Sequence, residues 1–197
     1  NPSPKFFPHD ASVYACTHSA VKFALDTLAG LACLHENLGF LHADISPSNI
    51  MYSNLDHCWK LNDFNLSINL CDAPSINWNA GTPGFKAPEV ELEGRQSAAS
   101  DVFSLGNVFS KVLLRTLPDA QLRHLPNIIK SARTTLGTLS EEMTAHDPQL
   151  RPTVKLALET ILKLFKLLAP THSDFIVRAA EEILRTKDIC APSATAP

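Results

Sequence analysis

The sequence contains no long run of basic residues, and its formal net charge is only -3 over 197 residues. A protein that binds nucleic acid or an anionic membrane through its charge carries a basic stripe or cluster. We therefore predict no nucleic acid and no membrane as a partner. The chain also lacks a charged-then-apolar leader, and Lys163 and Lys166 interrupt its most apolar late stretch. A signal peptide and a membrane-spanning helix are thus not predicted.

Cysteines are few and scattered, and no two of them form a CxxC pair. An odd number without paired spacing argues against both a disulfide framework and a zinc site. We expect a reducing compartment, cytoplasmic or nuclear. With 45% hydrophobic and 19% charged residues, the chain has the composition of one compact domain.

Helical periodicity is clearest in three stretches. Apolar residues from Val21 to Leu34 recur at helical spacing, which predicts a helix over residues 17–38 that stops at Gly39. A second helical face runs over residues 102–112, and 154–168 is a third, strongly apolar helix. Helices are therefore expected to dominate the second half.

Two short strand candidates, 50–53 and 58–61, flank an Asn-Leu-Asp-His turn and predict a small two-stranded ribbon. From Asp63 to about Gln96, repeated Pro and Gly predict a long irregular segment. Loops of that length within a compact domain are usually functional.

Three acceptor-rich side chains lie in or beside the predicted ribbon: Asp44, Asn49 and Asp63. Asn49 precedes the first strand and Asp63 follows the second, so a hairpin would return both to the same end of the ribbon. Carboxylate and amide oxygens suit Mg²⁺, and a further carboxylate can accept a proton from an attacking hydroxyl. The arrangement is suited to phosphoryl transfer.

These residues belong to five motifs that resemble those of eukaryotic protein kinases. Residues 42–49 are similar to the His-Arg-Asp catalytic loop with its Asn five positions after the Asp, and 63–65 resemble Asp-Phe-Gly. Residues 81–89 are similar to the end of a serine/threonine kinase activation segment, including Ala-Pro-Glu. Residues 101–106 match the opening of the central buried helix, and 147–153 match an Asp-Pro-x-x-Arg-Pro turn. The motifs occur in the family's order.

The resemblance implies a mainly α fold: a kinase-like C-terminal lobe with a small β-ribbon beside the catalytic loop. The expected division is an irregular lead-in over 1–16, the lobe over 17–168, and a C-terminal helix with a frayed tail over 169–197. No Gly-rich loop or Val-Ala-Ile-Lys-like strand lies among the 41 residues before His42. The N-terminal lobe is therefore absent from the sequence, and we expect it upstream of Asn1.

The resemblance also implies roles for individual residues. Asp44 would orient or deprotonate a protein substrate's hydroxyl, while Asn49 and Asp63 would hold the Mg²⁺ ions that neutralise the ATP phosphates. Ser46 would donate a hydrogen bond to a phosphate. The expected catalytic set is Asp44, Asn49 and Ser46, the metal ligands are Asn49 and Asp63, and the cofactor-binding residues are Asp63, Asn49, Met51 and Asn62.

Further positions would be structural. The resemblance implies that His42 stacks with Phe64, that Asp101 fixes the backbone around His42, and that Glu89 and Arg151 form a buried ion pair. Thr82 is expected to bond near Asp44.

Three residues depart from the family pattern. Ala43 replaces the Arg that pairs with a phosphorylated activation loop, so no such switch is expected. Ser46 replaces a Lys and supplies no positive charge. Asn65 replaces the Gly of Asp-Phe-Gly and tolerates positive φ, so the turn is expected to survive. Ala43 and Ser46 together resemble a divergent kinase family expanded in fungi.

The leading hypothesis is an ATP- and magnesium-dependent kinase acting on Ser or Thr of proteins. The alternative is a pseudokinase that serves as an interaction scaffold. A small-molecule phosphotransferase of the choline or aminoglycoside kinase type has a similar catalytic loop. It lacks the Ala-Pro-Glu triplet and the 147–151 turn, both of which are present here.

Overall fold

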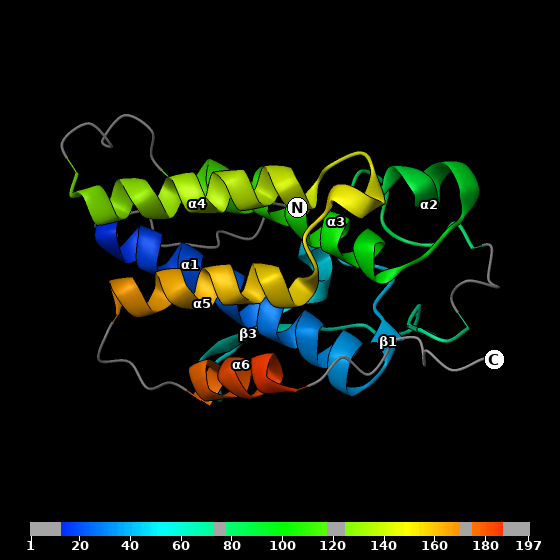
Figure 1. Ribbon diagram of the computed structural model, residues 1–197, viewed down its shortest axis with the longest axis horizontal. Helices are drawn as coiled ribbons and strands as arrows, with labels where there is room; N and C mark the ends of the chain where they lie inside the picture. The colour runs from blue at the N-terminus through cyan, green and yellow to red at the C-terminus, as the bar shows by residue number, and fades with distance from the viewer. Residues whose placement is uncertain (1–12, 73–77, 118–124, 170–174, 187–197) are drawn as a thin grey trace, which may run out of the picture.

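The computed structural model describes residues 13–72, 78–117, 125–169 and 175–186. Helices predominate in the described residues, and the strands there are short and lie within residues 40–69 (Figure 1). In chain order the elements are α1 (Val13–Ala32), β1 (Phe40–Leu41), β2 (Ile50–Ser53), β3 (Cys58–Leu61), β4 (Ile68–Asn69), α2 (Pro88–Glu93), α3 (Ala98–Val108), α4 (Asn127–Met143), α5 (Val154–Leu168) and α6 (Phe175–Arg185).

Helix α1 is the central element, because α4, α5, α6 and β3 all pack against it. Its side chain Phe23 is fully buried, 6.3 Å from the ring of Phe109 and 5.1 Å from that of Trp59 between ring centroids. Such aromatic pairs bury a large apolar area in one place. The core thus joins the first helix to the ribbon and to the end of α3.

The first helix was predicted over 17–38, and it begins earlier, at Val13. The hydroxyl of Thr17 donates to the carbonyl of Val13, so the first turn is already hydrogen-bonded where an irregular lead-in was expected. Residues 1–12 lie outside the described residues. At the other end the helix changes to a π-helical turn, Cys33–Asn37, and Gly39 at φ +72° ends it, as its sequence position predicts.

The ribbon has the two strands that the sequence predicts, residue for residue, with Ile50 opposite Leu61 and Ser53 opposite Cys58. The outer edge of β3 lies against α1. There the backbone N–H of Trp59 donates to the buried carboxylate of Asp26 over 3.0 Å, and Asp26 also accepts from Lys22. The outward N–H of Trp59 at this edge of the sheet is therefore bonded by a side chain rather than by a third strand.

The prediction of a wholly irregular segment from Asp63 to Gln96 is wrong in two places. β4 pairs with β1 in an antiparallel ladder, Phe40 opposite Asn69 and Leu41 opposite Ile68. Further on, α2 begins with Pro88 at its first turn and ends at Gly94, whose φ is +67°. Pro at a helix start and Gly just past the end are ordinary helix boundaries, so the breakers mark the ends of a short helix rather than exclude one.

Helices α3 and α4 approach each other closely at Gly106. A Cβ atom on Gly106 would lie 2.7 Å from Cβ of Met143, and the Ser140 hydroxyl donates to the Gly106 carbonyl over 3.1 Å. Helix α3 itself starts at a capping box formed by Ser97 and Ser100. It was predicted as one face over 102–112, but it passes into a π-helical turn at Phe109–Leu113.

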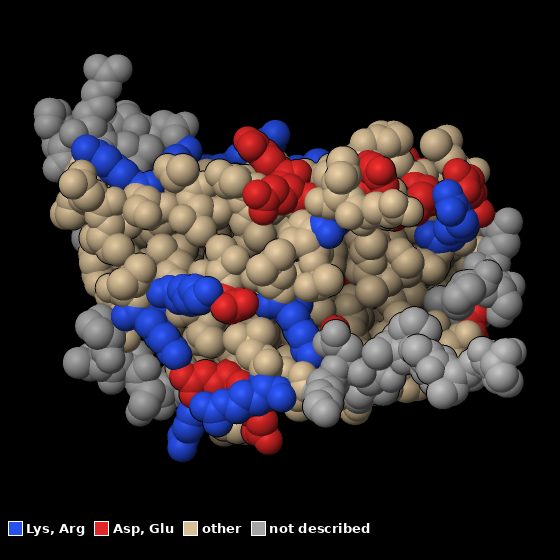
Figure 2. Space-filling view, in the orientation of Figure 1, with Lys and Arg blue, Asp and Glu red and all other residues tan. Residues whose placement is uncertain are grey.

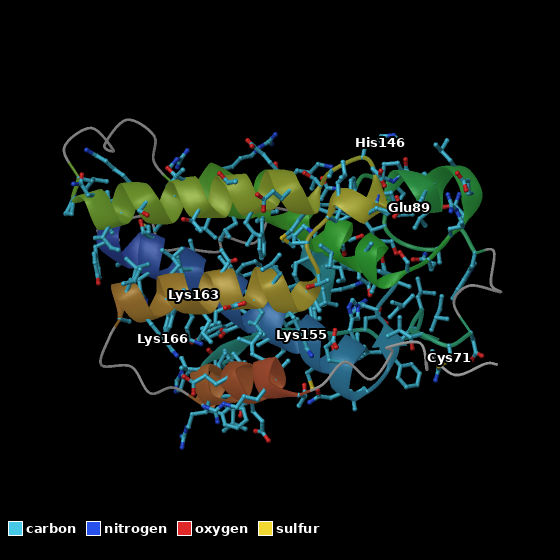
Figure 3. The ribbon with its side chains drawn as sticks, viewed as in Figure 1. Cys71, Glu89, His146, Lys155, Lys163 and Lys166 are labelled. Atoms are coloured by element: carbon cyan, nitrogen blue, oxygen red, sulfur yellow. The ribbon has the colours of Figure 1, made fainter. Side chains whose placement is uncertain are left out.

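Helix α5 has the predicted bounds, and α6 covers its side (Figure 1). The buried face of α6 is Val177, Ala180 and Ile183. Two lysines of α5 hold it: Lys166 pairs with Glu181 at 2.6 Å, and Lys155 donates to the carbonyl of Thr186 (Figure 3). On this face Lys and Arg lie beside Asp and Glu (Figure 2). The predicted frayed tail, 191–197, lies outside the described residues.

None of the helices in the described residues is both long and apolar enough to cross a membrane.

Candidate functional site

Asp44 lies between β1 and β2, and both oxygens of its half-buried carboxylate are engaged. Oδ1 accepts from the backbone N–H and the hydroxyl of Thr82 at 2.7 and 2.6 Å. Oδ2 accepts from Nδ2 of Asn49 at 2.9 Å, and the same Nδ2 donates to the Asp44 carbonyl. The expected bond between Thr82 and Asp44 is confirmed. Three segments of the chain therefore meet on one carboxylate.

The backbone before Asp44 is held in an unusual conformation by Asp101 at the start of α3. Ala43 has φ +64°, a region that costs a non-glycine residue roughly 1–2 kcal/mol. The buried carboxylate of Asp101 accepts from the N–H groups of His42 and Ala43 at 2.7 and 2.9 Å. The prediction that Asp101 fixes this backbone is confirmed.

His35 is a partner of Asp101 that the sequence did not reveal. Its Nε2 lies 2.9 Å from Asp101 Oδ2, its ring is buried, and Nδ1 has no hydrogen-bond partner among the described residues. The π-helical turn at the end of α1 carries this side chain. A regular helical pattern extended through residue 38 gives no signal for that placement.

Asn49 connects Asp44 to the ribbon. Its carbonyl accepts from the N–H of Asn62 at 2.9 Å, which extends the β2–β3 ladder by one pair. Asn49 is buried except for 8% of its surface. Its Oδ1 makes no hydrogen bond to the described part of the chain, because the amide is oriented by the Nδ2 bonds to Asp44.

Asp63 follows β3 and is exposed, with φ +63°. Its Oδ1 accepts from the N–H of Asn65 at 3.3 Å, an Asx-type turn. The positive φ was anticipated at Asn65, in place of the family's Gly, but it falls on Asp63 instead. Aspartate is one of the residues that tolerate this region because its short side chain can bond locally.

His42 and Phe64 are in contact, as the motif predicts, with ring centroids 5.1 Å apart. His42 is fully buried and its Nε2 lies 3.1 Å from the carbonyl of Asn62. Phe64, however, is 50% exposed rather than in the core, and its ring borders a cavity of about 470 Å³ between α1, β3 and α6. One side of Phe64 is thus uncovered in the described structure.

Met51 and Asn62 share one face of the ribbon. Cross-strand register pairs Met51 with Lys60, and Nδ2 of Asn62 lies 3.2 Å from the Met51 sulfur. Met51 is 55% exposed, and Lys60 pairs with Asp56. The two residues expected to bind the nucleotide base and its surroundings therefore present one accessible surface.

Ser46 is placed differently from the other expected catalytic residues. It is fully buried, and its hydroxyl lies 2.8 Å from that of Ser48. The three-residue helical turn Pro47–Asn49 that follows it carries the chain towards Asn49. The structure joins Asp44 to Asn49 directly but gives the Ser46 hydroxyl a neighbouring Ser as its partner.

Glu89 of α2 and Arg151 form the expected buried ion pair, with two parallel bonds of 2.6 and 2.8 Å. Arg151 also donates to the carbonyls of Ala145, His146 and Ala99, so the guanidinium is fully used. Figure 3 shows Glu89 and His146 close together at one end of the molecule. The pair fastens the activation-segment end of the site to the later helices.

The donor set fits a magnesium ion bound with nucleotide phosphates. Asn49 offers an amide oxygen just before β2, and Asp63, two residues after β3, offers a carboxylate oxygen with no bond to the described residues. Mg²⁺ prefers such oxygens and keeps positions for water or phosphate. Asp44 lies beside Asn49 as a further carboxylate, bonded to its Nδ2.

Comparison with known proteins identifies the family of the chain. Residues 9–165 match the model of the protein kinase domain, which is well over half of the chain. The chain belongs to the protein kinase family.

Among its relatives is the membrane-associated tyrosine- and threonine-specific cdc2-inhibitory kinase of Drosophila melanogaster, 34% identical over 143 residues, 68% of this chain and 26% of that protein. A probable serine/threonine-protein kinase of Dictyostelium discoideum is 28% identical over 156 residues, 72% of this chain and 9% of its own length. A probable serine/threonine-protein kinase of Arabidopsis thaliana is 28% identical over 186 residues, which cover 88% of this chain and 44% of that protein. The chain thus spans less than half of each of these relatives.

Proposed function

We propose that this chain is the catalytic half of a protein kinase that transfers the γ-phosphate of ATP to Ser or Thr hydroxyls of proteins. The observation that carries the proposal is the hydrogen-bonded unit of Asp44, Asn49 and Thr82. It joins the candidate base, a candidate metal ligand and the activation segment in one place. The Gly-Thr-Pro sequence at 81–83 supports Ser or Thr as the acceptor.

In the proposed reaction Asp44 accepts a hydrogen bond from the substrate hydroxyl and orients its oxygen towards the γ-phosphorus. The new oxygen–phosphorus bond forms as the bond to the β–γ bridging oxygen breaks, ADP leaves, and the hydroxyl proton passes to Asp44. Bound magnesium would neutralise charge on the phosphates, with Asn49 and Asp63 as its protein ligands. Met51 and Asn62 would line the nucleotide site.

The covering of the nucleotide is proposed to come from an N-terminal lobe outside these 197 residues. The exposed Met51 and the half-exposed Phe64 support this, since both lie where a nucleotide and a second lobe would cover them. The finer assignments, a cytoplasmic or nuclear kinase of the fungal-expanded type, rest on composition and on the Ala43 and Ser46 replacements.

The test is a radiolabel transfer assay on the full-length protein with ATP, magnesium and a generic protein substrate. Replacement Asp44→Asn keeps the size and most hydrogen bonds of the side chain but removes the base. A fall of about 100-fold or more in transfer is expected. Equal transfer by the variant would show that Asp44 is not the base.

The second candidate function is a pseudokinase that acts as an interaction scaffold. The buried Ser46 favours it, because a neutral hydroxyl bonded to Ser48 supplies no positive charge to a phosphate. Nucleotide binding would not separate the two functions, since a scaffold can retain ATP. Turnover separates them, because a pseudokinase transfers no more label than its own Asp44→Asn variant.

A further inference from the structure

Ion pairing is the rule for the lysines of this structure. Among the described residues, five lysines lie within 4.0 Å of a carboxylate: Lys22, Lys60, Lys155, Lys163 and Lys166. Figure 2 shows the same pairing of blue and red side chains over α5 and α6. Two lysines at residues 81–87 differ from these: Lys86, which belongs to that segment, and Lys111, which contacts it.

Lys86 and Lys111 have only neutral partners among the described residues. Nζ of Lys86 donates to Oδ1 of Asn79 at 2.7 Å. Nζ of Lys111 donates to the carbonyl of Gly84 and lies 5.2 Å from the centre of the Phe85 ring. The segment that ends in Ala-Pro-Glu therefore lies beside two positive charges, its own Lys86 and Lys111 of the turn after α3, and neither has an ion-pair partner in the described chain.

Lys86 lies next to the catalytic loop through Gly81. A Cβ atom on Gly81 would be 3.0 Å from the Ala43 carbonyl oxygen on one side and 3.0 Å from Cγ of Lys86 on the other. Gly81 also precedes Thr82, the residue that bonds Asp44. A single glycine without a side chain thus separates the stem of Lys86 from the backbone beside Asp44.

We propose that Lys86 recognises an acidic side chain, carboxylate or phosphate, that neighbours the acceptor hydroxyl in a peptide substrate. The inference rests on the proposed function, which puts the acceptor hydroxyl at Asp44. A substrate hydroxyl that reaches the Asp44 carboxylate lies beside Thr82, because Thr82 bonds the same carboxylate, and Lys86 follows Thr82 by four residues. Lys86 is the cation on that segment whose stem packs towards the catalytic loop.

Replacing the present partner of Lys86, the Asn79 amide oxygen, by an acidic group of the substrate is favourable. Asn79 is exposed and offers a neutral amide oxygen, which water can replace at little cost. A carboxylate or phosphate would form a charge-assisted hydrogen bond, about twice as strong as a neutral one. Lys86 is also half-buried, so its charge is screened less than that of a fully exposed lysine.

The experiment measures kcat/KM of the full-length protein for matched peptides. They share one Ser acceptor, and at each neighbouring position in turn they carry Asp, phosphoserine or Asn. The wild type is expected to prefer the Asp or phosphoserine peptide by about tenfold at one or more positions. The Asp and phosphoserine arms show which acidic group the site takes.

The acidic-to-neutral ratio of kcat/KM is then measured for three variants. Lys86→Met is expected to bring the ratio close to one, while Lys86→Arg retains it. Lys166→Met, which removes a lysine paired on α5, serves as the matched control and keeps the wild-type ratio. If Lys86 had a purely structural role, Lys86→Met would lower kcat/KM for the acidic and the neutral peptides alike and leave their ratio unchanged.

The outcomes separate the two proposals. Phosphorylation without an acidic preference, or a preference that survives Lys86→Met, overturns the assignment of Lys86 and leaves the proposed function standing. No phosphorylation of any peptide, by the wild type as by Asp44→Asn, contradicts the proposed function, and the inference falls with it.

Discussion

At the scale of the residue, two strained positions bracket the candidate site. Ala43 precedes Asp44 with φ +64°, and Asp63 has φ +63° at the end of the ribbon. Strain of this kind persists where the surroundings over-determine it, as the bonds from Asp101 do at Ala43. At Asp63 the positive φ is held by one local bond, from the N–H of Asn65 to Asp63 Oδ1.

The metal role of Asp63 is best tested with Asp63→Asn, because Asn also tolerates positive φ. In the full-length protein this variant should lower magnesium-dependent ATP turnover by about 100-fold or more, since a metal-binding charge is lost. Its melting temperature should change little, because Asp63 is exposed. Glu91→Gln, at an exposed carboxylate of α2, is the control; an Asp63→Asn variant as active as this control would remove Asp63 from the site.

Thiol reactivity tests the packing of β3. Burial raises the pKa of the Cys58 thiol, and the nearby Asp26 carboxylate raises that pKa further. Since the thiolate is the reactive form, Cys58 should be alkylated far more slowly than the exposed Cys71. Mass-spectrometric mapping of iodoacetamide labelling at neutral pH reports the order, and faster labelling of Cys58 would contradict the packing.

At the scale of the element, the packing of α3 and α4 predicts opposite changes in stability when Gly106 or Gly137 is replaced by Ala. Gly106→Ala should destabilise the fold by about 1–3 kcal/mol, because the added Cβ meets Met143 at 2.7 Å. Gly137→Ala on α4 meets nothing within 4 Å and should stabilise the fold by about 0.5–1 kcal/mol through helix propensity. Urea unfolding of the two variants measures both signs, and a stabilising Gly106→Ala would disprove the close contact.

The Glu89–Arg151 pair carries the link between α2 and the turn before α5. Glu89→Ala leaves a fully buried guanidinium without its carboxylate and should cost about 3–5 kcal/mol. Replacing both partners, Glu89→Leu with Arg151→Met, should recover much of that loss, since a buried pair often contributes little more than apolar packing. If the double variant were no more stable than Glu89→Ala, the other bonds of Arg151 would dominate.

The sequence predicted elements that depend on local interactions and missed those that depend on contacts between residues far apart in the chain. β2, β3 and α5 were predicted with their bounds, because alternation, a turn sequence and helical periodicity are all local. The β1–β4 pair was missed, because two residues of strand form only when partners 27 and 29 positions away pair with them. The Asp44–Thr82 contact came from the motif resemblance, whereas the burial of Ser46 and the place of Lys86 depend on packing that no motif encodes.

At the scale of the whole molecule, the described structure brings together the candidate metal ligands and the candidate base, while the ribbon face with Met51 and Asn62 is exposed. The 197-residue chain should fold by itself, because its helices share one core around α1. It should transfer no phosphate, since positioning and charge around the phosphates supply nearly all of the catalysis. A radiolabel assay on the purified chain, with Asp44→Asn as the control, tests this; transfer above the control would show that one lobe suffices.

Ala43 also makes a prediction for regulation. Without an Arg at this position, no charge-assisted bond to a phosphorylated activation segment can form there. Phosphatase treatment of the full-length protein should leave its activity within about twofold, equivalent to a few tenths of a kcal/mol. A large loss of activity after treatment would show that another cation reads the phosphate.

The bond from Trp59 to Asp26 has a consequence for solubility. A two-stranded ribbon has open edges, and an open edge can recruit a strand from another molecule and begin an aggregate. On β3 the outward N–H of Trp59 is already occupied by a carboxylate held within α1. A strand approaching this edge would have to displace that carboxylate and bring its own backbone up against a buried negative charge. With Asp26 in place, the outward N–H of Trp59 is unavailable to a strand of another molecule, and we expect this edge of the ribbon to resist intermolecular sheet growth.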